Sequence, residues 1–276
     1  MLQVAENAVE ELLTTPGDAL LVPPHCESPP ALKLSLVVPT FNEAENIASF
    51  LQSVYGQLRP VLGEAFEVIV VDDDSPDGTW KLAAGLMPSL ANLRVLRRRG
   101  ERGLASAVIR GWQSARGEWL GAIDADFQHP PEILPRMLAL TAGNENGAVD
   151  LVAASRYCES GSVGDWNLYR RLASRGAYLL GRLLVPHIFR RVSDPLTGCY
   201  LVRRSAISGI AFNPAGYKTL IETLSCSRVG RIAEAGYCFQ KRRAGYSKAL
   251  PKEYWLYLRH LGRLRRTLSG RNPSEH

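Results

Sequence analysis

Short apolar runs recur along this chain, and each is followed by a stretch with helical periodicity. The runs that have the character of buried strands are Leu34–Pro39, Phe66–Asp72, Leu93–Leu96, Trp119–Asp124 and Asp150–Ser155. The segments between them are long enough to form crossover helices. Strands that alternate with helices build a mostly parallel sheet with helices on its faces. The sequence therefore predicts an α/β, Rossmann-like fold.

The first of these helices has a recognisable start. Asn42 stands where a capping residue is expected, and Glu45 follows three residues later, which is the spacing of a capping box. The helix predicted from this start places four apolar residues on one face: Ile47, Phe50, Leu51 and Val54. We expect that face to pack on the sheet.

Composition limits the class of protein. With 276 residues, 46% of them hydrophobic, the chain is expected to bury a core and to be ordered. Its five cysteines have no paired spacing, which argues against a disulfide framework and a structural zinc site and favours a reducing compartment. Arg182 and His187 interrupt the best candidate for a membrane-spanning run, and the start lacks a secretory signal. A cytoplasmic location is expected.

Both ends of the chain differ from its middle. Residues 1–32 are rich in proline and lack a sustained period, so we expect a flexible arm outside the fold. Residues 33–250 are expected to form the main domain. Residues 251–276 are expected to form a basic amphipathic helix and a tail, in which Trp255 and Leu258 accompany Arg259 and other arginines.

The stretch Trp166–Phe189 has the same basic amphipathic character as Lys252–Leu268. Both could lie in a membrane interface, or each could pack its apolar face on the sheet and expose its arginines. The net charge of +6 comes mainly from arginines after Arg156, so this half of the chain calls for an anionic partner. Nucleic acid, anionic lipid and phosphate-bearing substrates all satisfy that requirement.

Polar clusters follow three of the predicted strands: Pro39–Glu43, Asp72–Asp74 and Asp124–Asp126. Sheets of this kind bind ligands in the crevice beyond the carboxyl ends of their strands. We therefore expect the three clusters to converge on one site.

Asp124, Asp126 and Gln128 place oxygen-bearing side chains at alternate positions just beyond a strand. Hard oxygen ligands suit Mg²⁺ or Mn²⁺, which lean on substrate phosphates, so this pattern is typical of a site that handles a diphosphate. The alternative is that the two aspartates cap the helix that starts near Pro131.

The run Asp72–Thr79 contains good turn residues in Pro76, Asp77 and Gly78. Turn chemistry leaves Asp72 unexplained, and a carboxylate there could accept hydrogen bonds from a ribose or a nucleobase. Because no G-x-G-x-x-G follows the first strand, a dinucleotide-dependent oxidoreductase is disfavoured.

Cationic side chains recur in the second half of the chain: Arg156, Arg170, Lys218, Arg242 and Lys248. Arginine grips phosphate in a fork and lysine acts as a point charge, so this set could hold a diphosphate donor and a phosphate acceptor. For any one of them the alternative is a solvated surface cation. The histidines are sparse and unpaired, which gives poor support to a hydrolytic histidine dyad.

Together these segments resemble the successive signatures of family 2 glycosyltransferases. The residues that carry the resemblance are Val37–Glu43, Asp72–Thr79, Asp124–Asp126 and Gln128–Pro131. The later segments Ser155–Tyr157, Trp166–Arg170, Asp194–Gly198, Asn213–Lys218 and Arg242–Lys248 resemble one branch, the dolichol-phosphate mannose synthases. The resemblance covers Leu34 to Arg266 and implies the glycosyltransferase A type of fold.

The resemblance also implies a role for each matching residue. Pro39, Phe41 and Glu43 would surround the nucleobase, and Asp72 would lie near the nucleoside. The metal and the donor diphosphate would meet Asp124, Ala125, Asp126 and Gln128. Arg156, Lys218, Arg242 and Lys248 would line the phosphates, while Arg170 would face the lipid phosphate. Asp126, Arg156 and Arg170 are thereby the expected catalytic residues.

The implied reaction is an inverting transfer of mannose from GDP-mannose to a polyprenyl phosphate, with Mg²⁺ or Mn²⁺. The chain resembles the short form, which relies on a membrane-embedded partner subunit or on its own amphipathic helices at the membrane surface, and nucleic acid is not expected as a partner. Three alternatives remain: a polyprenyl-phosphate glucosyltransferase that uses UDP-glucose or another donor, a nucleotidyltransferase, and a non-catalytic membrane-associated subunit.

Overall fold

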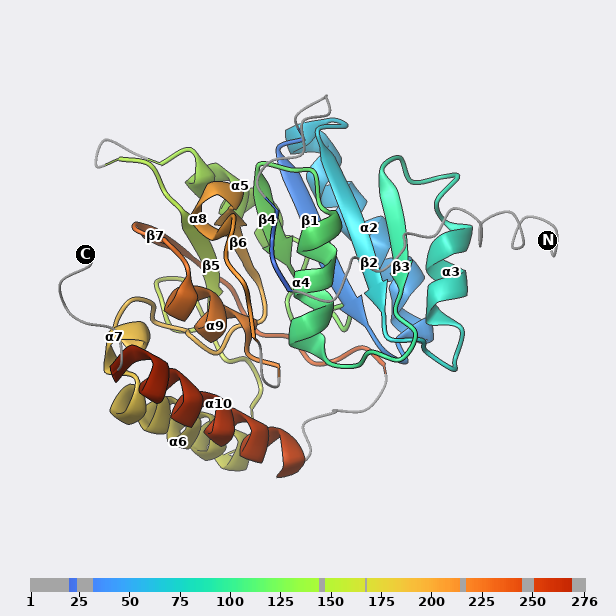
Figure 1. Ribbon diagram of the computed structural model, residues 1–276. Coiled ribbons are helices and arrows are strands. Elements are labelled where there is room, and N and C mark those ends of the chain that lie inside the picture. The colour runs from blue at the N-terminus through green and yellow to red at the C-terminus, as the bar shows by residue number, and fades with distance from the viewer. Residues whose placement is uncertain are drawn as a thin grey trace.

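The computed structural model describes residues 20–23, 32–143, 147–166, 168–213, 217–244 and 251–269. These residues form a seven-stranded sheet with the strand order β3-β2-β1-β4-β6-β5-β7 (Figure 1). Helices cover both faces of the sheet, so the predicted α/β class is confirmed.

The strands are β1 (Leu34–Thr40), β2 (Phe66–Asp72), β3 (Leu93–Arg97), β4 (Trp119–Ala122), β5 (Leu151–Ser155), β6 (Tyr200–Arg203) and β7 (Ile232–Gly236). Every predicted strand is present within two residues of its expected ends. Neighbouring strands are parallel except at β6, which runs antiparallel to both β4 and β5. The sequence patterns did not predict β6 or β7. The sheet is thus mostly parallel, with one reversed strand near its middle.

Helices α2 (Ala44–Leu62), α3 (Thr79–Gly85) and α5 (Ile133–Thr141) share one core cluster with the sheet, while α4 (Leu104–Ser114), α7 (Pro186–Phe189), α8 (Arg204–Ile207) and α9 (Thr219–Cys226) share the other. Phe50 and Met137 lie in the first cluster, and Trp112 and Tyr200 lie in the second. Burying one such side chain contributes about 1.5 to 3 kcal/mol, so the two clusters fix the sheet between its helical layers.

The apolar face predicted for the first helix is confirmed, because Ile47, Phe50, Leu51 and Val54 are all buried in α2. The predicted cap is wrong. Asn42 has a φ of 53°, and α2 begins only after Glu43, without a side-chain cap. The backbone N–H of Asn42 instead donates to Ser75 Oγ at 3.0 Å, so this residue joins two loops at the sheet edge.

Part of the N-terminal arm also differs from expectation. Leu21 forms a β-bridge with Ala211, and the Val22 side chain is buried in the second core cluster. Residues 20–23 therefore pack on the fold, although residues 1–32 were predicted to lie outside it. The remainder of the predicted arm before Leu32 lies outside the described residues.

Two helices lie side by side beyond one end of the sheet, α6 (Leu168–Leu184) and α10 (Pro251–Ser269), and both are amphipathic as predicted (Figure 1). Four leucines of α6 are largely exposed: Leu168, Leu172, Leu179 and Leu183, the last at 74%. On α10, Trp255 and Leu258 are exposed as well. The alternative in which the whole apolar face of α6 packs on the sheet is therefore wrong. In the described parts of the chain, no helix is both long enough and apolar enough to cross a membrane.

Candidate active site

The polar clusters predicted to converge do so at the carboxyl edge of the sheet. β1, β2 and β5 end there in Thr40, Asp72 and Ser155. Because β6 is antiparallel, the loop that precedes it reaches the same edge, where Ala154 N–H donates to the carbonyl of Cys199 at 3.0 Å. The loop after β7 also arrives there, since Gln240 N–H donates to the carbonyl of Gln128.

Asp124 and Asp126 stand just beyond β4, which ends two residues before Asp124. Asp126 is buried, and its Oδ1 accepts a hydrogen bond from the Gln128 backbone N–H at 2.9 Å. The Asp124 side chain keeps 29% of its surface exposed. Burial, and then the charge of Asp126, raise the pKa of Asp124 to about 7. Ala125, which was predicted to contact the donor, is itself buried. The two aspartates do not act as side-chain caps of α5.

Arg242 links the acidic pair to the start of α2. Its guanidinium lies 2.7 Å from Asp126 Oδ2 and 3.4 Å from Glu43 Oε1. Asn46 donates to Glu43 Oε2 at 2.8 Å, which fixes the second oxygen of that carboxylate. The predicted base-pocket residue Glu43 and the predicted phosphate ligand Arg242 are therefore in contact, and their charges compensate one another in this state of the protein.

Asp72 is fully buried beneath the loop that follows β2. It accepts hydrogen bonds from Ser75 N–H at 2.8 Å, from Ser75 Oγ at 2.7 Å and from Thr40 Oγ1 at 2.7 Å. Desolvation raises its pKa despite these bonds. The turn therefore does employ Asp72, contrary to the sequence-based interpretation, and its carboxylate holds the loop after β2 against the end of β1.

The next residue ties a second loop to the same edge. Arg98 is fully buried and forms an ion pair with Asp73, whose Oδ2 also accepts the Gly103 N–H at 2.8 Å. The loop between β3 and α4 is thereby fixed, and the Arg102 guanidinium lies 4.8 Å from the Phe41 ring centroid. Phe41 and Pro39 are half-buried, so each retains surface that a planar group could contact.

Arg156 lies at the end of β5, where it is buried against Asp194 in a two-pronged pair. Its Nε and Nη2 lie 2.6 and 2.7 Å from the two carboxylate oxygens. The rings of Trp166 and Phe239 lie 5.0 and 5.4 Å from its guanidinium carbon. Although burial acts against its charged form, the hydrogen bonds and charge of Asp194 raise the pKa of Arg156 overall, so it stays charged.

Arg170 opens α6 above the same aromatic pair, 4.6 Å from the Trp166 ring centroid and 5.1 Å from that of Phe239. Lys218 stands immediately before α9, and its Nζ donates to the carbonyl of Leu196 at 2.6 Å. Burial, with smaller contributions from the charges of Arg156 and Arg170, lowers the pKa of Lys218 to about 8, although Asp194 and Asp124 act in the opposite direction. These charged side chains therefore lie close enough to Lys218 to change its pKa.

His129 and Gly198 frame Asp124. Burial, and then Arg156, lower the pKa of His129 to about 3, so the ring is neutral at pH 7. Its Nδ1 lies 3.9 Å from Asp124 Oδ2 and has no hydrogen-bond partner among the described residues. A Cβ on Gly198 would meet Asp124 Oδ2 at 2.9 Å. Any larger residue at position 198 would therefore displace the Asp124 carboxylate.

This environment fits a divalent cation. Two carboxylates crowd together, one of them with a raised pKa, and a buried ring nitrogen beside them lacks a partner among the described residues. A cation relieves such repulsion, and carboxylate oxygens are the ligands that Mg²⁺ and Mn²⁺ prefer. The described residues contain no cluster of three acidic, histidine or cysteine side chains, so a cation here would need further ligands from substrate or water.

Sequence reasoning found most of the charged residues but missed their surroundings. Asp194 was part of a family motif without a role, and His129, Trp166 and Phe239 were given none either. The partner role of Asp194 follows from the burial of Arg156, because a buried arginine requires a carboxylate, and that burial is evident only in the fold. Lys248, predicted to line the phosphates, lies outside the described residues.

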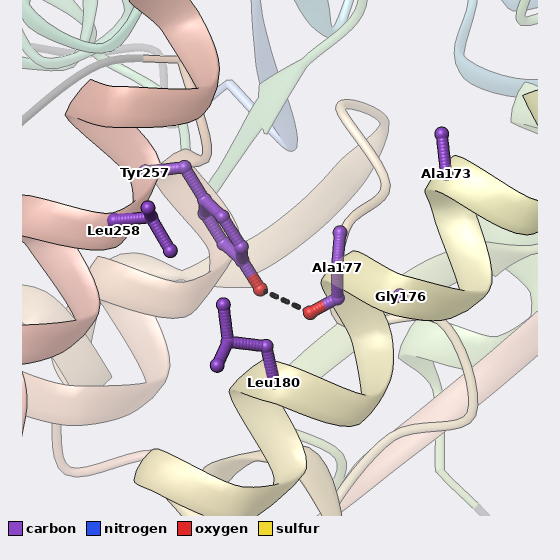
Figure 2. Close-up of a pocket in the computed structure, with 6 residues that line it drawn as sticks. All are labelled: Ala173, Gly176, Ala177, Leu180, Tyr257 and Leu258. Carbon is purple, nitrogen blue, oxygen red and sulfur yellow. Dashed lines mark hydrogen bonds between the residues drawn. The ribbon is translucent and has the colours of Figure 1, made fainter.

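The joint between α6 and α10 holds an apolar hollow of about 270 Å³, shown in Figure 2. Its lining comes from both helices: Ala173, Gly176, Ala177, Leu180, Tyr257 and Leu258. Ala173 is one helical turn beyond Arg170, so the hollow begins close to the cationic end of α6.

Relatives of known name align with most of this chain. The Dolichol-phosphate mannosyltransferase of Pyrococcus furiosus is 40% identical over 233 residues, which are 84% of this chain and 64% of that protein. The protein of the same name from Mycosarcoma maydis is 34% identical over 247 residues, which are 87% of this chain and 81% of that protein. The chain thus spans less than two thirds of the Pyrococcus protein.

Solved structures share the fold at low identity. Mannosyl-3-phosphoglycerate synthase from Rubrobacter xylanophilus matches with a TM-score of 0.65 and 21% identity, over 88% of this chain and 77% of that one. Glucosyl-3-phosphoglycerate synthase from Mycobacterium tuberculosis, in complex with Mn²⁺, UDP and glucosyl-3-phosphoglycerate, matches with a TM-score of 0.56 and 23% identity, over 86% and 77%.

A family match agrees with the fold and with the ordered motifs at the sheet edge. The family described as Glycosyl transferase family 2 matches residues 35–210, a span that runs from β1 to just beyond β6. By this match, and by its identity with two named relatives, the chain belongs to glycosyl transferase family 2.

Proposed function

We propose that this protein transfers mannose from GDP-mannose to a polyprenyl phosphate, with inversion at the anomeric carbon. The observation that carries the proposal is the meeting of an acidic pair, Asp124 and Asp126, with the cations Arg156, Arg170 and Lys218 at one sheet edge. A diphosphate donor and a phosphate acceptor together need that combination. The names of the two relatives supply the sugar and the lipid.

The nucleoside of the donor would bind over β1 and β2. Pro39 and Phe41 would contact the base, Glu43 would accept hydrogen bonds from it, and Asp72 would hold the loop beneath the ribose. Arg242 now compensates Asp126 and Glu43. We expect it to turn toward the donor diphosphate when that group arrives, because a diphosphate offers the guanidinium more negative charge.

Asp124, Asp126 and Gln128 would hold Mg²⁺ or Mn²⁺ together with the diphosphate. The bound cation would neutralise charge on the departing nucleoside diphosphate. The solved Mycobacterium tuberculosis relative contains Mn²⁺ with UDP, which supports a divalent metal of this kind. His129 is neutral and held against Asp124, so it would orient that carboxylate without adding a second cation.

The acceptor phosphate would bind between Arg170 and Lys218. A phosphate monoester has a second pKa of about 6 and is largely ionised at neutral pH, so no strong general base is needed. Its oxygen attacks the anomeric carbon while the bond to GDP breaks, and GDP leaves from the opposite side. The protein contributes alignment of the two substrates and preformed charge around the leaving group.

The first isoprene units of the acceptor would lie in the hollow between α6 and α10, which begins one turn beyond Arg170 (Figure 2). The exposed leucines of α6 and the neighbouring arginines would seat this helix pair in an anionic membrane surface. We accordingly propose that the protein works as a peripheral protein on the cytosolic face of a membrane, alone or with a membrane-embedded partner subunit.

The decisive experiment mixes purified protein, Mg²⁺ or Mn²⁺ and a polyprenyl phosphate with GDP-mannose or UDP-glucose, and follows label into the lipid phase. We expect transfer from GDP-mannose and release of GDP. Transfer from UDP-glucose instead would reassign the donor, and release of pyrophosphate would indicate a nucleotidyltransferase. If neither donor is turned over and no donor binds with metal, the protein is a non-catalytic subunit and the proposal is wrong.

Membrane seating is tested by flotation with phosphatidylcholine vesicles, with and without phosphatidylglycerol. We expect binding that requires the anionic lipid. The double variant Leu172→Glu, Leu179→Glu should bind vesicles at least tenfold more weakly, since each leucine contributes about 1.5 to 3 kcal/mol of burial free energy. Leu82→Glu removes an exposed leucine from α3 instead and should leave binding unchanged. Equal binding by all three proteins would contradict this part of the proposal.

A further inference from the structure

The inner side of α10 carries a buried polar cluster that the proposed reaction does not use. Glu222 of α9 is 5% exposed, and its Oε2 lies 2.7 Å from His260 Nε2 and 2.8 Å from Arg263 Nη2. The other oxygen of Glu222, Oε1, accepts the backbone N–H of Asn213 at 3.1 Å. His260 is 1% exposed. An apolar contact would join two helices as firmly, so this cluster calls for another explanation.

The cluster is one helical turn from the active site. Lys218 immediately precedes α9, and Glu222 stands four residues later, on the first turn of that helix. Lys218 in turn donates to the carbonyl of Leu196, in the loop that leads to β6. Two contacts therefore place Lys218: α9 holds its backbone, and the Leu196 carbonyl holds its ammonium group.

The same buried face of α10 is also joined to α6. The hydroxyl group of Tyr257, one turn before His260, donates a hydrogen bond to the carbonyl of Ala177 at 2.8 Å, as Figure 2 shows. Ala177 lies two turns beyond Arg170 on the same helix. Helix α10 thus contacts both α6, which carries Arg170 in its first turn, and α9, which follows Lys218.

These contacts have a directional character that apolar packing lacks. A buried carboxylate accepts hydrogen bonds only from donors in particular places, so a shift of α10 along or about its axis would leave Glu222 with unpaired oxygens. Buried polar contacts of this type fix the register of neighbouring helices. Arg170 and Lys218 are also near enough for the charge of Arg170 to help lower the pKa of Lys218.

We propose that Glu222, His260 and Arg263 are positioning residues for the acceptor phosphate. They hold α10 as a brace between α6 and α9 and so set the separation of Arg170 from Lys218, the two cations that would grip the phosphate. The proposal rests on the proposed function, since it assigns the acceptor to these two residues. None of the three touches the acceptor itself.

The test compares His260→Leu with His260→Gln, because glutamine keeps a donor for Glu222 and leucine does not. Three quantities are measured: the dissociation constants of GDP with Mg²⁺ and of a short-chain polyprenyl phosphate in detergent, and the melting temperature. We expect His260→Leu to weaken polyprenyl phosphate binding about tenfold, because a small change in the spacing of Arg170 and Lys218 would misalign both cations, and to leave GDP binding unchanged. His260→Gln should recover most of the loss.

A matched pair of charge variants extends the test to the outer end of the cluster. Arg263→Ala removes a contact to Glu222, whereas Arg266→Ala removes an exposed arginine from the next turn of the same helix. We expect only Arg263→Ala to weaken acceptor binding. If His260→Leu fails to fold, Arg263→Ala supplies the measurement, because the Arg263 side chain is 32% exposed and its loss is better tolerated.

The outcomes separate the inference from the function on which it rests. Normal acceptor binding in the variants, with only a lower melting temperature, would give the cluster a purely structural role and overturn the brace. An equal loss of GDP and acceptor binding would overturn it too. A wild-type protein that binds no polyprenyl phosphate would overturn the proposed function and the brace together.

Discussion

The two halves of the sheet contribute opposite charges to the site. From β3 to β4 the strands are parallel, and their carboxyl ends deliver the carboxylates Asp72, Asp124 and Asp126. From β6 to β7 the strands are mixed, and the loops around them deliver Arg156, Lys218 and Arg242. One half thus suits a metal and a nucleoside, while the other suits phosphates. The two halves meet at the ion pair of Asp126 with Arg242, which is where we propose that the donor and the acceptor react.

The largest expected effect on activity comes from removing the carboxylate of Asp126, which lies in the acidic half of the site. Asp126→Ala should lower the rate of transfer at least a hundredfold, because a group that stabilises the departing charge is lost. The fold should stay intact, because the loss of the ion pair with Arg242 is offset by relief of the repulsion between Asp126 and Asp124. Asp165→Asn, at an exposed position, is the matched control and should retain full activity. Retained turnover in Asp126→Ala would refute the metal assignment.

The basic half should be separable from the acidic half through its acceptor arginine. Arg170→Ala should raise KM for the polyprenyl phosphate about thirtyfold, which corresponds to one lost charge-assisted contact, and leave KM for the donor unchanged. Arg171→Ala removes the neighbouring exposed arginine and should have little effect. If only the KM for the donor rises, Arg170 binds the nucleotide-sugar donor and not the acceptor.

Gly198 tests how closely the halves fit. It belongs to the loop before β6, yet a Cβ there would press on Asp124 of the other half. Gly198→Ala should therefore lower metal-dependent GDP binding about tenfold, by about 1.4 kcal/mol, through displacement of that carboxylate. Gly56→Ala, with nothing within 4 Å of its Cβ, should leave GDP binding intact. Unchanged binding in Gly198→Ala would mean that Asp124 moves aside without consequence.

The smallest effect is a pH dependence that belongs to the basic half. The pKa of Lys218 is about 8, and a bound phosphate dianion would favour the charged ammonium and raise it. Above pH 8 the free protein has lost the Lys218 proton, which the complex with phosphate retains. Binding then requires uptake of a proton, so acceptor affinity falls as pH rises through about 8. We expect about a fourfold loss between pH 7 and pH 8.5. In Lys218→Arg the loss should disappear; a profile identical to wild type would exclude Lys218 as its source.

The acidic half was also the more predictable one. Its strands are continuous apolar runs, and the carboxyl ends of parallel strands meet at one edge, so Asp124 and Asp126 could be assigned to the site from the sequence. Asn42 shows where local patterns fail. Its spacing to Glu45 suited a cap, but the tertiary contact with Ser75 draws it into a left-handed loop conformation instead.

The basic half was predicted as a set of cations without an arrangement. β6 is four residues long and β7 is partly exposed, so neither produces a strong periodic signal. The pairing of Arg156 with Asp194 depends on where β6 enters the sheet, and α6 exposes leucines that a globular pattern would bury. Such contacts between distant segments are outside what local sequence patterns specify.

The reversal of β6 has a consequence for how such a protein can change. Since β5 runs toward the carboxyl edge and β6 runs away from it, residues 156–199 leave the sheet and return to it at the same place. That excursion contains α6, α7, Arg170 and Asp194. This segment starts and ends at the same edge of the sheet, so it can become longer or shorter without any change in the strands. Exchanging this excursion would replace α6 and Arg170, while β1 to β4, over which we propose that the nucleotide binds, would stay as they are.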